Sequence, residues 1–173
     1  NMKLLHRLDK EILVLDGSMG SLLQSMGLPA GYAPDLWNLE APQKIVQIHK
    51  EYIQAGAHMI ITNTFGATSL RLQEYDMQHR AVEINQQAAQ IARKAAGDKI
   101  LVAGDIGPLG KTLSPMGDFP FREAVQVYKE AATGLDQGGV DVFILETIMD
   151  IQEMKAAVMG VQSVSKKPII TSM

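Results

Sequence analysis

Apolar runs that end in an acidic or amide residue recur along this chain of 173 residues. Four of them end at Asp16, Asn63, Asp105 and Glu146, and a fifth run covers residues 168–173. Such runs are typical of parallel strands that helices cover on both faces. Parallel strands place their carboxyl ends on one rim, where α/β proteins keep their sites. The repeat therefore predicts both the architecture and the location of the chemistry.

Segments with helical periodicity separate these runs. They cover residues 18–26, 42–56, 79–96, 121–137 and 150–164. Asp150 is the expected N-cap of the last helix, with Glu153 at the capping-box position. The predicted order of elements is β-α-β-α-β-α-β-α-β. Residues 1–10 are expected to form an N-terminal extension, and residues 11–173 the domain.

Two topologies share this pattern, an open doubly wound sheet and a (β/α)₈ barrel. A barrel typically needs about 250 residues, so this length holds only about five of its eight units. Length alone favours a complete doubly wound domain, whereas the chemistry of the loops favours part of a barrel.

Composition excludes several classes of partner. The net charge is −3 without a long basic run, which makes nucleic acid an unexpected partner. We expect no membrane span and no signal peptide, which makes the cytoplasm the default location; Asn1 before Met2 resembles a tag remnant. The chain has no cysteine and no two-histidine spacing, so we expect no disulfide, thiol nucleophile or metal site within it.

The first polar loop contains Asp16, Gly17 and Ser18 at the start of a helix. Helix N-terminal N–H groups can hold a small anion such as a carboxylate, and glycine permits close approach of a ligand. The alternative is a tight turn in which Asp16 or Ser18 caps the helix.

The second polar loop contains Thr62, Asn63 and Thr64. These neutral donors and acceptors can orient a polar ligand without acid–base chemistry. Alternatively, they satisfy the backbone groups of the loop.

The third loop follows Asp105 and is rich in glycine and proline up to Gly117. It exceeds the usual 2–6 residues of a βα connection, which suggests a lid or wall over a site. The alternative is an irregular connection with Asp105 as a turn residue.

Glu146 follows an apolar run that should be an interior strand. A carboxylate there is costly unless it is paired or faces a ligand at the rim. Glu146 and Asp16 on one rim would form an anionic patch suited to an ammonium group. The alternative is an internal ion pair with a lysine or arginine.

Other prominent side chains are interpreted as structural. Trp37 is expected to be a packing anchor of the first long loop. Solvated helix faces are expected to carry the charges of Arg71, Arg80, Arg93, Lys94 and Lys99.

Four phrases in a fixed order carry a resemblance to a known family. They are residues 15–21 (Leu-Asp-Gly-Ser-Met-Gly-Ser), 62–67 (Thr-Asn-Thr-Phe-Gly-Ala), 104–108 (Gly-Asp-Ile-Gly-Pro) and 145–147 (Leu-Glu-Thr). From about Glu11 to the last residue the chain resembles the homocysteine-binding domain of the homocysteine S-methyltransferase family. The third phrase and the following Ser-Pro-Met-Gly are most similar to the cobalamin-dependent methionine synthase branch. The resemblance implies the first five or so βα units of a (β/α)₈ TIM barrel.

The resemblance also implies roles for the polar residues of the rim. Asp16 and Glu146 would face the amino group of homocysteine. The rest of the pocket would be shaped by Gly17, Ser18, Thr62, Asn63, Thr64 and Asp105. In the family, a zinc ion held by three cysteines binds the thiol and yields a thiolate that attacks a methyl group. In the methionine synthase branch that methyl sits on cobalamin, carried by another module and recharged from a methyl-folate domain.

The absence of cysteine departs from this pattern. We expect the segment to supply the amino-acid-binding part of the site, to hold no zinc, cobalamin or catalytic residue, and to be inactive alone. Its partners would be homocysteine and the methyl-folate and cobalamin modules of the parent protein. Open barrel edges also predict self-association. The alternative function is therefore a non-catalytic half-barrel scaffold or amino-acid-binding module that self-associates.

Overall fold

The computed structural model describes residues 2–173, and Asn1, the expected tag remnant, lies outside them. Its helices are α1 (Met2–Leu8), α2 (Met19–Ser25), η1 (Pro34–Leu36), α3 (Trp37–Glu40), α4 (Pro42–Gln54), α5 (Ser69–Leu72), η2 (Gln73–Tyr75), η3 (Gln78–Arg80), α6 (Ala81–Ala96), α7 (Phe121–Gly138) and α8 (Ile151–Gln162). Its strands are β1 (Met59–Ile61), β2 (Leu101–Ile106), β3 (Val142–Leu145) and β4 (Ile169–Thr171).

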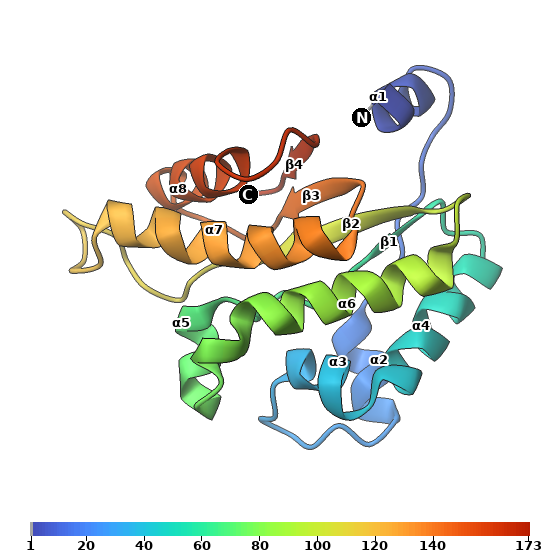
Figure 1. Cartoon of the computed structure of the whole chain (residues 1–173), viewed down its shortest axis with the longest axis horizontal. Coiled ribbons are helices and arrows are strands. Elements are labelled where there is room, and N and C mark those ends of the chain that lie inside the picture. Colours follow the sequence, from blue (N-terminus) through green and yellow to red (C-terminus); the bar gives the residue numbers. More distant parts are fainter. Residues whose placement is uncertain (1) are drawn as a thin grey trace.

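The four strands form one parallel sheet in the order β1-β2-β3-β4. Every strand follows its sequence neighbour, so the strand order never reverses. A doubly wound sheet needs such a reversal, whereas a (β/α)₈ barrel adds each unit in the same direction. The prediction of a partial barrel is confirmed, and the doubly wound alternative is wrong. Figure 1 shows the long helices α6 and α7 lying along the sheet.

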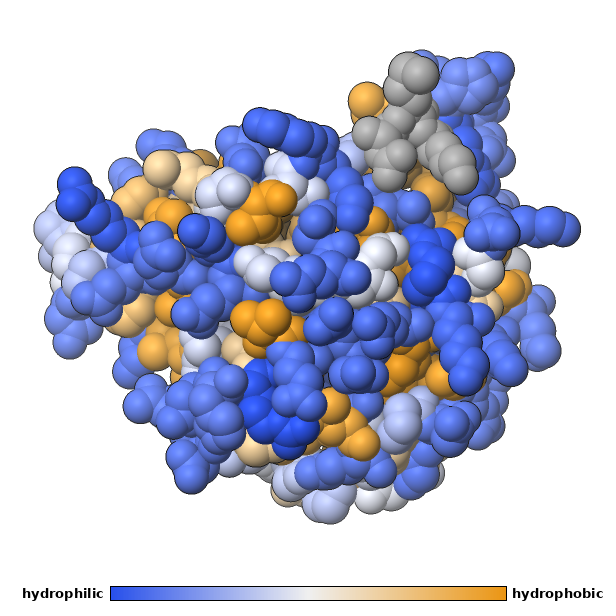
Figure 2. Space-filling view, in the orientation of Figure 1, coloured by the Kyte–Doolittle hydropathy of each residue, from blue (hydrophilic) through white to orange (hydrophobic). Residues whose placement is uncertain are grey.

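The main core lies between the sheet and the helices on its outer side. Phe143 and Leu145 of β3 pack there with Tyr128 of α7. Helices α4 and α6, α6 and α7, and α7 and α8 are packed neighbours. Gly160 of α8 permits one of these contacts, because a Cβ there would lie 2.7 Å from the Cβ of Tyr128. The exposed sides of these helices are largely hydrophilic with scattered apolar side chains (Figure 2).

The inner side of the sheet carries a second, smaller cluster. Met59, Ala103, Val142 and Ile144 are buried there together with Leu4 of α1. The apolar strands predicted helices on both faces of the sheet. On the inner side only part of α1 meets the sheet among the described residues, because in a barrel the strands curve and their inner side chains pack on one another. The N-terminal extension contributes Leu4 to this cluster.

The first apolar run forms less structure than predicted. Leu15 makes a single parallel bridge with Met59, and Ile12 is 88% exposed. The N–H of Val14 donates to Nδ1 of His58 at 3.1 Å rather than to a strand carbonyl. Residues 12–15 have a strand neighbour on one side only, and of their side chains only Leu13 packs against the inner cluster.

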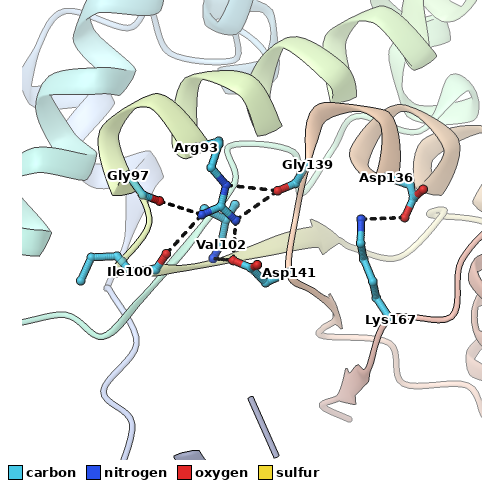
Figure 3. Close-up of polar contacts among 8 residues, drawn as sticks. All are labelled: Arg93, Gly97, Ile100, Val102, Asp136, Gly139, Asp141 and Lys167. Atoms are coloured by element: carbon cyan, nitrogen blue, oxygen red, sulfur yellow. Dashed lines mark hydrogen bonds and ion pairs between the residues drawn. The ribbon is translucent and has the colours of Figure 1, made fainter. Parts of the chain in front are cut away.

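Arg93 joins three elements at the amino end of the strands (Figure 3). Its guanidinium donates to the carbonyls of Gly97, Ile100 and Gly139 and forms an ion pair with Asp141. Asp141 also accepts from the N–H of Val102 at 2.9 Å. The interpretation of Arg93 as a solvated charge is therefore wrong. Nearby, Lys167 pairs with Asp136 at 2.9 Å.

Glu153 anchors the long loop after β2. Asp150 caps α8 as predicted, since its side chain accepts from the N–H of Gln152. Glu153 does not complete a capping box. It is buried, and its Oε1 accepts from the N–H of Leu109 at 2.7 Å and from the hydroxyl of Tyr128 at 2.9 Å. The long loop is thus tied to α7 and α8. Within residues 2–173, no helix has the length and apolarity needed to cross a membrane.

Candidate functional site

A pocket of about 720 Å³ opens at the carboxyl ends of the strands. The eight residues that the sequence suggested for the site all line it, namely Asp16, Gly17, Ser18, Thr62, Asn63, Thr64, Asp105 and Glu146. They come from four separate segments of the chain, with Asp105 near the end of β2. The parallel order of the strands therefore brings the polar loops to one place, as the rim argument predicted.

One carboxylate oxygen of Asp16 accepts a hydrogen bond from the backbone, whereas the other accepts none from the described residues. Its Oδ2 accepts from the N–H of Ile61 at 3.0 Å. Its Oδ1 is buried without a hydrogen-bond partner among residues 2–173. Burial raises the pKa of Asp16 to about 7, and the nearby charge of Glu146 adds to the effect. Oδ1 of Asp16 is thus an acceptor that lacks a donor.

Asp105 is held at the pocket floor through its backbone. The hydroxyl of Thr64 donates to the carbonyl of Asp105 at 2.7 Å, and the N–H of Asp105 donates to Oγ1 of Thr62 at 2.9 Å. The two hydroxyls lie 2.7 Å apart, and since the proton of Thr64 is already used, Thr62 is the donor between them. Both threonines therefore satisfy backbone groups while they line the pocket.

The side chain of Asp105 itself is nearly isolated. It is 4% exposed, and its Oδ1 has no partner in the protein. Burial raises the pKa of Asp105 well above its usual range. The charges of Glu146, Asp35 and Asp16 raise it further. The pocket floor is therefore short of hydrogen-bond donors and positive charge.

Glu146 continues β3, which lies between β2 and β4 as an interior strand. It is partly buried and lines the pocket, and burial raises its pKa. No lysine or arginine forms a salt bridge with it among residues 2–173. The ion-pair alternative is thus not observed. Thr147 after it has φ 61°, which is strained for a β-branched residue.

Gly17 and Ser18 directly precede α2. Oγ of Ser18 accepts from the N–H of Ser21 at 3.4 Å, so this residue caps the helix. The hydroxyl of Tyr52 donates to the carbonyl of Ser18 at 3.0 Å. A Cβ on Gly17 would lie 3.0 Å from that hydroxyl oxygen, so the close approach favours glycine.

Asp35 is a site residue that the sequence interpretation missed. It lines the pocket, is 4% exposed and accepts from the N–H of Gly66 at 3.0 Å through Oδ1. Burial raises its pKa to about 6. The available signal was an acid within the mostly apolar stretch from Ala33 to Trp37. Trp37 itself is a buried packing residue, as expected.

The outer part of the pocket also lacked a sequence signal. Tyr32 and Tyr75 line it with their rings edge to face, 6.1 Å apart. Arg71 and Glu74 complete that side, with Nη1 of Arg71 3.8 Å from Oε1 of Glu74. The side chain of Arg71, expected on a solvated helix face, is 45% exposed but belongs to the pocket wall.

The residues present do not fit a zinc ion. The sequence contains no cysteine, and no group of three histidine, aspartate or glutamate side chains suited to a metal occurs among residues 2–173. The carboxyls that line the pocket include two with a buried, unpartnered oxygen, which instead favours a ligand with several N–H donors.

Comparison with known proteins decides the family. The homocysteine S-methyltransferase profile matches residues 13–173. The chain belongs to the homocysteine S-methyltransferase family.

Solved structures agree on the fold of this family member. The chain is similar to the oxidized form of the homocysteine methyltransferase MmuM from Escherichia coli, with 26% identity, a TM-score of 0.76, and 94% of this chain and 62% of that chain covered. The metallated form gives 23% identity, a TM-score of 0.74, and coverage of 97% and 64%. The apo form gives 24% identity, a TM-score of 0.73, and coverage of 96% and 61%. The chain thus spans less than two thirds of the length of these proteins.

Proposed function

We propose that this chain supplies the amino-acid-binding part of a homocysteine S-methyltransferase site. The observation that carries the proposal is the pocket in which Asp16 and Asp105 each present a buried carboxylate oxygen without a partner. An ammonium group offers three donors and one positive charge, which is what these oxygens lack. Family membership supports homocysteine as the amino acid.

Asp16 and Glu146 are the proposed ligands of the ammonium group. Burial raises both pKa values, that of Asp16 to about 7, so Asp16 is only partly ionised at neutral pH. An ammonium group between them favours the ionised forms and lowers both pKa values. Asp105 and the segment from Thr62 to Thr64 would then bound the rest of the amino acid.

The parent protein is proposed to methylate the thiol of homocysteine and form methionine. The resemblance to the methionine synthase branch supports methylcobalamin as methyl donor, with methyl-folate and cobalamin modules as partners. A cytoplasmic location stays a prediction. Because the residues present do not fit zinc, no step of thiol activation is assigned to this chain, and we expect it to show no methyl transfer by itself.

Calorimetric titration with L-homocysteine tests the binding proposal. The full chain should bind the amino acid, and Glu146→Gln should remove most of the affinity because it deletes a negative charge at nearly constant shape. Glu123→Gln on α7 is the matched control, because Glu123 does not line this pocket. Absence of binding by the unaltered chain would contradict the proposal.

A self-associating half-barrel is the second candidate function. The two lateral edges of the sheet favour this function. Residues 14–16 border the outer edge of β1 through backbone hydrogen bonds but have no strand on their own other side, and β4 pairs with β3 alone among the described residues. Unpaired strand edges are templates for pairing with another chain. Light scattering over a range of concentrations should then show dimers or larger species, and a monomer at all concentrations would contradict it.

A further inference from the structure

The segment from Ala33 to Asn38 forms a support at the side of the pocket, which its first three residues line. Leu36 is 3% exposed, and Trp37 is 8% exposed. The ammonium of Lys44 lies 4.2 Å from the centroid of the Trp37 ring, a cation–π arrangement. Leu36 and Trp37 lie between Asp35 and Asn38 in the sequence. Their burial therefore holds the polar groups of Asp35 and Asn38 in place.

Asn38 joins this support to residues 62–66, here called the wall segment. Its Nδ2 donates to the carbonyl of Asn63 at 2.7 Å and to the carbonyl of Asp35 at 2.7 Å. Both neighbours are acceptors, so the orientation of the amide is determined by its contacts. Asn63 reciprocates, since its own Nδ2 donates to the carbonyl of Pro34 at 2.8 Å.

Asp35 holds the other end of the wall segment. Its Oδ1 accepts from the N–H of Gly66 at 3.0 Å. A Cβ on residue 66 would lie only 2.9 Å from Oδ2 of Asp35, so the close contact requires glycine there. Hydrogen bonds thus join the wall segment to the segment from Ala33 to Asn38 at two places, the carbonyl of Asn63 and the N–H of Gly66.

Inside the wall segment, the hydroxyls of Thr62 and Thr64 hold the backbone of Asp105. Hydrogen bonds joined through the backbone of residues 62–64 therefore link Asn38, which does not line the pocket, to the backbone of Asp105 at the pocket floor. We propose that Asn38 and Asp35 are positioning residues, which hold the wall segment and Asp105 in the arrangement that binds the amino acid. This inference rests on the proposed function.

The chain contains a matched control for a purely structural role. Asn85 is also fully buried, and its Nδ2 also bridges two backbone carbonyls, of Ala67 at 2.7 Å and of Ala81 at 2.8 Å. In both asparagines Oδ1 has no partner. Neither Asn85 nor the residues that it joins line the pocket. Loss of the two donors should therefore cost similar stability at both positions.

The experiment compares Asn38→Asp with Asn85→Asp in the full chain. Each keeps its shape but replaces two N–H donors with an acceptor. Calorimetry with L-homocysteine should show an affinity about tenfold or more weaker for Asn38→Asp, because small displacements of a binding wall are costly. Asn85→Asp should stay within about twofold of the unaltered chain. Equal affinities for the two variants, at equal folded fractions, would overturn the proposal.

A second readout needs no ligand. Burial raises the pKa of Asp35 to about 6, and the charges acting on it include Arg71 from α5 and Asp105 from β2. The amide resonance of Gly66 should follow this titration by NMR, and Asp35→Asn should abolish that response. Asn38→Asp should shift the amide resonance of Asp105, whereas Asn85→Asp should leave it in place.

The two readouts separate this inference from the proposed function. If the unaltered chain binds no homocysteine, the proposed function fails. If, by contrast, the amides of Gly66 and Asp105 respond to neither Asp35→Asn nor Asn38→Asp, the positioning role fails, whatever the chain binds.

Discussion

Asp16 and Ile61 are joined by a hydrogen bond of 3.0 Å from the backbone N–H to Oδ2, while Oδ1 of Asp16 is buried without a partner. The carboxylate is thus half satisfied by the fold. An ionised carboxylate in this state destabilises the folded protein. It contributes favourably only when a bound ligand supplies the missing donor.

Asp16→Asn should stabilise the chain at alkaline pH. The pKa of Asp16 is about 7 in the folded chain against an ordinary value of 3.8, so its stability contribution is present below pH 3.8 and lost as pH rises through 7. At pH 8 the variant should gain on the order of 1–3 kcal/mol in free energy of unfolding. The gain should shrink toward pH 4 in urea titrations. A variant less stable than the unaltered chain at pH 8 would contradict this.

Binding of homocysteine should release protons. Near pH 7 Asp16 is about half protonated, and burial also raises the pKa values of Glu146 and Asp105. An ammonium ligand favours the ionised carboxylates, so affinity should rise between pH 6 and 8. Calorimetry in buffers of different ionisation enthalpy should report release of about half a proton or more at pH 7. Heats that do not depend on the buffer would exclude this coupling.

His49→Leu should protect the chain against acid. His49 is fully buried, neither ring nitrogen has a partner, and burial lowers its pKa from 6.5 to about 4. Its neutral form supports folding above pH 6.5, and this support is lost as pH falls through 4. Leucine should add about 1–2 kcal/mol at pH 7, and the difference between variant and unaltered chain should grow toward pH 5. A constant difference across this range would contradict the assignment.

Glu153→Ala should loosen the long loop after β2. The change leaves the buried N–H of Leu109 and the hydroxyl of Tyr128 without their acceptor. We expect a loss of about 2–4 kcal/mol in free energy of unfolding. Hydrogen exchange at Leu109 should also accelerate. Glu153→Gln retains an acceptor oxygen and should lose less; an equal loss in both variants would show that the charge, not the acceptor, holds the loop.

Arg93→Ala should weaken the amino end of the barrel without affecting the pocket. It removes the donors to Gly97, Ile100 and Gly139 and leaves Asp141 without its cation. Chemical denaturation should show a loss of about 2–3 kcal/mol. Arg80→Ala is the control, because the pair of Arg80 with Glu83 is exposed and should contribute below about 1 kcal/mol.

The elements themselves were largely predictable, because a helix or strand depends on periodicity over short distances. Helices α4, α6, α7 and α8 and strands β1 to β4 lie where the apolar patterns indicated them. Residues 12–15 are the exception, since their pattern predicts a strand but a strand needs neighbours that pattern alone does not supply.

The sequence by itself determined which polar residues stand at the ends of parallel strands, and therefore that Asp16, Asp105 and Glu146 share one pocket. Only the tertiary structure decided which of these groups stay unpaired and which other residues join them. Asp35 meets Gly66 across 31 positions, and Glu153 meets Leu109 across 44. Contacts of this kind depend on how complete βα units pack together. The local periodicity of the sequence carries no information about that packing.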